Sequence, residues 1–190
     1  MKIPLSSKLL TLIKQYAFLL RLILFYFLWK GTYFFIWRVD VLFETYNKTV
    51  WWLIARIIDL SALSLDFIGF KDLIIAYPER LIAIKGSGGV DIGEPCIGLG
   101  VFYMFISLTV AWKGLKRKQL WFIPVGLLIL HLLNIARVST LCLLSHYNRA
   151  LLDFNHDFTF KIIIYSAIFG LWMYWIKLID RSANNLSVVK

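Results

Sequence analysis

The sequence predicts an all-α polytopic membrane protein with about four transmembrane helices, an amphipathic helix and a small extracytoplasmic β-hairpin. Sixty per cent of its 190 residues are hydrophobic, whereas soluble domains average about 45–50%. The mean hydropathy is +0.74. The formal net charge is +10, but the basic residues flank apolar segments. We therefore expect them to orient a membrane protein, and we exclude nucleic acid as a partner.

The first transmembrane helix is predicted at about residues 16–37. Its basic start is typical of a signal peptide, but Arg21 interrupts the apolar segment and no small-residue cleavage site follows. We interpret it as an uncleaved span. Aromatic residues crowd its second half, as in an interfacial belt.

Residues 40–68 are long enough to span a membrane, but polar residues recur along them. They form either an amphipathic helix on the membrane surface or a span whose polar stripe faces the bundle; we favour the surface helix. Arg56 and Asp59 can pair at i, i+3 in both cases. The β-like runs that follow, with a Gly-rich turn at 86–89, predict the hairpin.

Three further spans are predicted at about residues 96–112, 119–145 and 159–179. The basic loop Lys113–Lys118 marks the cytoplasmic side. A cytoplasmic N-terminus then requires an odd number of spans before residue 70, which one span plus a surface helix satisfies. The prediction is one membrane-embedded domain, 1–190, with a core at 16–179, both termini cytoplasmic and a flexible tail at 180–190.

A cysteine stands where the polar Gly-rich segment enters the second predicted span, in the sequence Glu94-Pro95-Cys96-Ile97-Gly98. Pro95 suits the first position of a helix. Cys96 would then lie in the first turn, where the helix dipole favours a thiolate. The alternative is a cysteine that only fills space at a helix end.

An arginine and a histidine are predicted at the same membrane face as Cys96. Arg137 lies in the outer part of the third span, where a cation is a functional candidate; the alternative is a structural cation. His156 lies in the outer loop, where the alternative is a solvated side chain without a catalytic role. Imidazole can move the thiol proton, and guanidinium can neutralise an oxyanion.

Other polar residues have supporting or structural interpretations. His131 and Asn134 share one helical face with Arg137, which suggests a polar network around the arginine. Cys142 falls in an apolar run and is expected to pack. No ligand pair has metal-like spacing, so we expect neither a metal nor another cofactor.

Three segments together resemble the exosortase/archaeosortase family, particularly its compact Bacteroidetes type: residues 94–98, Asn134–Arg137 and Asn155–Phe158. The resemblance covers roughly residues 16–179. Ile97 departs from the family pattern, because many members have a serine there. We therefore expect that the chemistry here does not need this serine, or that another residue fills its role.

The resemblance implies a membrane cysteine transpeptidase or peptidase. Such an enzyme cleaves C-terminal sorting signals, which comprise a short motif, a membrane helix and a basic end. It holds the protein as a thioester and passes it to an envelope acceptor, such as a polysaccharide or a lipid. The resemblance also implies a multi-pass protein of the bacterial inner membrane, with its active site on the extracytoplasmic side.

The residue roles that the resemblance implies are Cys96 as nucleophile, Arg137 as oxyanion stabiliser and His156 as general acid and base. The supporting positions are Glu94, Gly98, Asn134 and Asp157. Two alternatives stay open. One is a non-enzymatic membrane scaffold or envelope-polysaccharide assembly subunit, and the other is a thiol oxidoreductase that uses Cys96 and Cys142.

Overall fold

The computed structural model describes residues 16–112, 116–151 and 154–188, and within these ranges helices dominate, as predicted. The long elements are α2 (Ala17–Arg38), α3 (Asp40–Phe67), α4 (Leu99–Ala111), α5 (Lys116–Tyr147) and α7 (Phe160–Val188). The strands are β1 (Leu73–Ala76), β2 (Leu81–Ile84) and β3 (Val90–Asp91). Short helical turns are η1 (Glu94–Ile97), η2 (Arg149–Leu151) and η3 (Asn155–Thr159).

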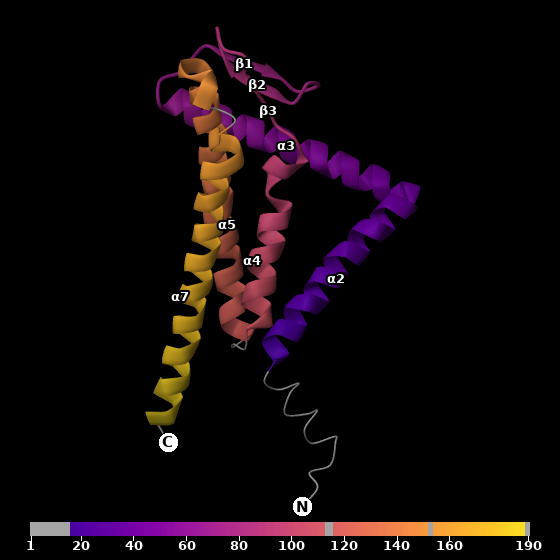
Figure 1. Cartoon of the computed structure of the whole chain (residues 1–190), viewed down its shortest axis with the longest axis vertical. Helices are drawn as coiled ribbons and strands as arrows, with labels where there is room; N and C mark the ends of the chain where they lie inside the picture. The colour runs from indigo at the N-terminus through magenta and orange to yellow at the C-terminus, as the bar shows by residue number, and fades with distance from the viewer. Residues whose placement is uncertain (1–15, 113–115, 152–153, 189–190) are drawn as a thin grey trace, which may run out of the picture.

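Helices α4, α5 and α7 run side by side as a bundle (Figure 1). Its core contains buried aromatic side chains from all three, among them Phe105, Phe122 and Trp175. Gly126 of α5 permits this packing, because an added Cβ would lie 2.2 Å from the Phe105 ring. The apolar side chains of these helices therefore lie partly in the core of the bundle and partly at its surface.

Helix α2 meets α4 at one end and diverges from it toward the other (Figure 1). At the convergent end, Arg21 Nη1 donates a hydrogen bond to the carbonyl oxygen of Ala111, 3.0 Å away. At the other end α2 stops at Arg38, because Val39 takes an extended conformation and α3 begins at Asp40. The two helices thus form a wedge.

Helix α3 crosses the upper ends of α4 and α5 instead of running alongside them (Figure 1). It rests on α5 where Ser64 and Ser139 share a hydrogen bond of 2.5 Å. The predicted pair of Arg56 and Asp59 is present, at 2.8 Å. This placement agrees with the surface helix rather than with a span. We call the end formed by α3 and the strands the sheet end.

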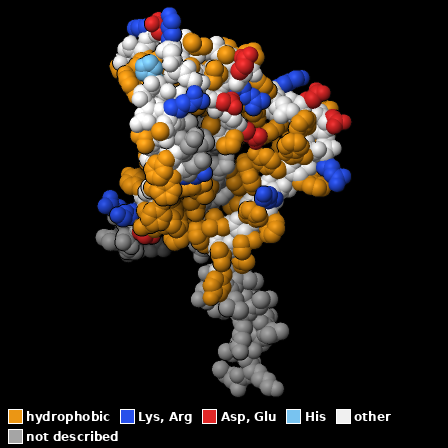
Figure 2. All heavy atoms as spheres, turned by 45° about the horizontal axis from the view of Figure 1, so that its top comes forward, with side chains coloured by type: hydrophobic (Ala, Val, Ile, Leu, Met, Phe, Trp, Pro, Cys, Tyr) orange, Lys and Arg blue, Asp and Glu red, His pale blue; other side chains and the backbone are white. Residues whose placement is uncertain are grey.

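The strands form a three-stranded antiparallel sheet in the order β1-β2-β3. Its buried side chains, including Ile82, Ile84 and Val90, join a second core with α3 and α5. The β-like runs of the predicted hairpin are therefore all present as strands. Figure 2 shows charged side chains gathered at the sheet end, above a surface rich in hydrophobic side chains.

The observed helices differ in length from the predicted spans. Among the described residues, three helices are long and apolar enough to cross a membrane, namely Ala17–Arg38, Arg117–Tyr147 and Phe160–Arg181. Helix α4 has 13 residues, or about 20 Å, which is shorter than the hydrocarbon core of about 30 Å. The predicted loop Lys113–Lys118 is shorter than expected, because Lys116 already begins α5, and residues 113–115 lie outside the described ranges. Helix α7 continues to Val188, through most of the segment predicted as a flexible tail.

Candidate active site

Cys96 lies in a 3₁₀ turn, η1, and not in the first turn of an α-helix as predicted. Its backbone N–H donates to the carbonyl of Gly93 at 3.0 Å. Gly98 follows with a φ of +80° and redirects the chain, so α4 begins only at Leu99. Pro95 does take an N-terminal helical position, but in η1 and not in α4, and the dipole argument for the thiolate does not apply to this turn.

Asn134 ties the cysteine turn to α5. Its Nδ2 donates to the carbonyl oxygen of Cys96 at 2.5 Å, and only 2% of the Asn134 surface is exposed. The same asparagine lies beside Gly98, whose added Cβ would be 3.9 Å from its Cγ. Two segments that are 38 residues apart in the chain thus meet. Losing the bond would leave a buried carbonyl unsatisfied, at a cost of about 1–3 kcal/mol.

Arg137 lies one turn beyond Asn134 on α5, about 4.5 Å farther along the helix. Its Nε is buried, and within the described part of the chain it has no hydrogen-bond partner. The expected network among His131, Asn134 and Arg137 is not found: no hydrogen bond joins these side chains. A buried guanidinium N–H without a partner is rare in folded proteins, and Arg137 follows by three residues the asparagine that bonds to the cysteine turn.

His156 belongs to the π-helical turn η3, which precedes α7 at the sheet end. The side chains of His156 and Asp157 lie outside what the structure describes. The sheet end thus gathers the turn of Cys96, the upper part of α5 and the backbone of His156. Contact of the imidazole with the thiol stays a prediction.

Glu94 is held by two tyrosines from different helices. Its Oε1 accepts hydrogen bonds from Tyr33 of α2, at 3.1 Å, and from Tyr46 of α3. Burial raises the pKa of the Tyr46 hydroxyl, and its hydrogen bond to Glu94 raises it further. Glu94 therefore fastens the cysteine turn to the corner between α2 and α3.

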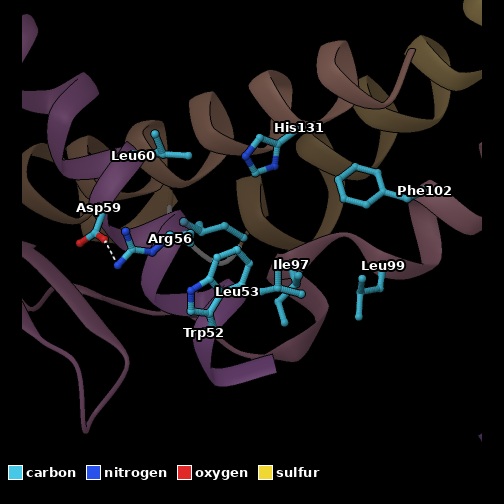
Figure 3. A pocket seen from close by; sticks show the side chains of 10 residues that line it. Trp52, Leu53, Arg56, Asp59, Leu60, Ile97, Leu99, Phe102 and His131 are labelled. Carbon is cyan, nitrogen blue, oxygen red and sulfur yellow. Dashed lines mark ion pairs between the residues drawn. The ribbon is translucent and has the colours of Figure 1, made fainter. Parts of the chain in front are cut away.

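A cavity of about 330 Å³ lies on the other side of the turn, between α3, α4 and α5. Ile97, the residue after the cysteine, forms part of its wall (Figure 3). His131 and Phe102 line it from α5 and α4, and Arg56, paired with Asp59, lines it from α3. His131 therefore faces a cavity beside the cysteine turn, where sequence reasoning expected it in a polar network around Arg137.

The second cysteine has different surroundings. Cys142 is fully buried in α5, with its Sγ 3.8 Å from the carbonyl oxygen of Ile82 in β2. Both cysteines are free thiols. Burial does not distinguish the two cysteines, since Cys96 is only 5% exposed. The hydrogen bond from Asn134 to the Cys96 carbonyl does distinguish them. The packing role predicted for Cys142 is consistent with this environment.

Comparison with known proteins adds one finding. The family described as Transmembrane exosortase (Exosortase_EpsH) matches residues 8–174. The chain belongs to the transmembrane exosortase family. The match includes all three segments on which the resemblance was based. Searches of curated proteins and of solved structures return no match to this exosortase.

Sequence reasoning missed the residues that hold the exosortase motif in place. Tyr33 was assigned to an interfacial belt and Tyr46 was not singled out, yet both bind Glu94. A tyrosine is a poor signal by itself, because its hydroxyl often reaches water at a membrane interface. A half-buried acid needs a donor, however, so the recurrence of tyrosines near one end of α2 and α3 was the available sign.

Proposed function

We propose that this exosortase is a membrane cysteine transpeptidase that cleaves C-terminal sorting signals at the extracytoplasmic face and transfers the exported protein to an envelope acceptor. The observation that carries the proposal is the bond between Asn134 and the Cys96 carbonyl. It brings the cysteine motif and the arginine motif of the family to one place in the fold.

In the proposed reaction, the Cys96 thiolate attacks the carbonyl carbon of the scissile peptide bond. Arg137 stabilises the resulting oxyanion, and its unpartnered buried Nε supplies a free donor for that purpose. His156 takes the thiol proton and gives it to the leaving amine as the C–N bond breaks. The acceptor's nucleophile then attacks the thioester and releases Cys96.

The charge pattern supports the orientation. Arg21, Arg117 and Arg181 lie at or near the ends of the three long apolar helices that are remote from the sheet. The positive-inside rule assigns that end to the cytoplasm. The sheet end, with Cys96 and His156, then faces the outside of the inner membrane, where exported substrates arrive.

The test is processing of an exported reporter that ends in a sorting signal from the same genome, co-expressed with single variants. We expect Cys96→Ala, Arg137→Ala and His156→Ala each to abolish cleavage while the enzyme still accumulates in the membrane. Matched controls are Cys142→Ala, Arg181→Ala and His146→Ala, which should retain cleavage. Retained cleavage in Cys96→Ala refutes the nucleophile, whereas equal loss in Cys142→Ala points to general destabilisation.

A further inference from the structure

A groove that the proposed chemistry does not use opens laterally between α2 and α4. It encloses about 550 Å³. Helix α2 lines it with side chains from Leu22 to Lys30, and α4 lines it from Gly100 to Leu108. Its position follows from the wedge of the two helices (Figure 1), which converge at Arg21 and diverge toward the sheet end.

The groove has an apolar lower part and a cation at its upper end. Lys30 is the charged residue among its lining side chains, and it is the lining residue of α2 nearest the sheet end, as Gly100 is for α4. Within the described residues Lys30 forms no ion pair; its ammonium lies 5.9 Å from the centre of the Tyr26 ring. Below it, Phe25 and Tyr103 pack against each other and join the helices through a hydrogen bond of 2.6 Å.

This polarity matches one class of ligand. A lipid of the leaflet at the sheet end has its phosphate toward that end and its chains toward the membrane centre, in the same order as Lys30 and the apolar lining. An apolar transmembrane helix in the groove would leave the Lys30 ammonium without a counter-charge, which is costly in a membrane.

We propose that the groove between α2 and α4 is a binding site for one anionic phospholipid, with its phosphate on Lys30 and an acyl chain along Tyr103 and Met104. A smaller cavity of about 260 Å³ continues upward from it, sharing Trp29 and Gly100, and reaches Glu94 and Pro95. The bound headgroup therefore lies beside the turn that carries Cys96. This site exists whether or not the cysteine is catalytic.

Native mass spectrometry of the delipidated full chain tests the proposal, with phosphatidylglycerol and a diacylglycerol of the same chains as probes. We expect one phosphatidylglycerol per protein and about fivefold weaker binding to Lys30→Gln, the effect of one cation near an anionic lipid. Arg38→Gln removes a cation of the same helix outside the groove and should bind as the wild type does. Diacylglycerol should bind more weakly and show no dependence on Lys30.

A second pair of variants tests the location. Gly100→Leu adds a side chain where nothing lies within 4 Å and should block both lipids, whereas Gly31→Leu, equally open but outside the groove, should not. Equal phosphatidylglycerol binding by wild type and Lys30→Gln overturns the proposal, and so does equal loss in Arg38→Gln. Displacement of the lipid by a sorting-signal helix at one-to-one stoichiometry assigns the groove to that helix instead. None of these measurements depends on substrate processing. The lipid-site proposal can therefore fail while the proposed enzymatic activity holds, and the reverse.

Discussion

Gly98 shapes the cysteine turn at the scale of single residues. Its φ of +80° lies in the left-handed region, where L-residues are disfavoured by about 1–2 kcal/mol. A side chain there would meet only ordinary contacts, the nearest at 3.7 Å. The backbone conformation, and not space, therefore requires glycine between Cys96 and α4.

Replacing this glycine gives a direct prediction. Gly98→Ala should lower the stability of the protein by about 1–2 kcal/mol and reduce processing, because the turn that presents Cys96 shifts. Gly100→Ala, two residues on with open space around it and no positive φ, should leave both nearly unchanged. Thermal unfolding in detergent measures the stability, and equal melting temperatures for the two variants would contradict this account.

Tyr46 gives a prediction about pH. Burial and the bond to Glu94 raise its pKa above the ordinary value of 10.0. The unfolded chain therefore loses this proton first as pH rises. The stabilisation is fully present below about pH 10 and declines above it. Melting temperatures of wild type and Tyr46→Phe should differ most at neutral pH and converge under alkaline conditions; a difference that stays constant would show that Tyr46 does not titrate in this way.

At the scale of elements, the bundle depends on close approach of α4 and α5. Gly126→Ala should lower stability by about 1–3 kcal/mol, because the added methyl overlaps the fully buried Phe105 ring. Gly170→Ala in α7 is the control: nothing lies within 4 Å of its added Cβ, and alanine favours the helix by about 0.5–1 kcal/mol. Unfolding in detergent separates the two, and no loss in Gly126→Ala would argue against this packing.

The elements also show what sequence can predict. Apolar length and charge placed the long helices and the surface helix, because both are local properties of the chain. The start of α4 was misplaced, because a proline and a cysteine at a helix start suit a 3₁₀ turn as well. The contact of Asn134 with the Cys96 carbonyl was out of reach, since helical periodicity gives the face of α5 on which Asn134 lies but not the segment that meets it.

At the scale of the whole molecule, the account predicts a definite orientation. In a background with both cysteines replaced by alanine, Glu79→Cys lies in the exposed turn between β1 and β2, and Arg181→Cys lies near the opposite end of α7. An impermeant maleimide should label Glu79→Cys in intact spheroplasts and Arg181→Cys only after permeabilisation. The reverse pattern would place Cys96 in the cytoplasm and exclude the proposed function.

The most direct test of the central claim is capture of the acyl-enzyme. In a Cys142→Ala background co-expressed with the sorting-signal reporter, mass spectrometry should find the reporter's new C-terminus joined to the peptide that contains Cys96. Hydroxylamine should release it, as expected for a thioester, and Cys96→Ala should not form it. Complete processing without an adduct on Cys96, continuing in Cys96→Ala, would contradict the account.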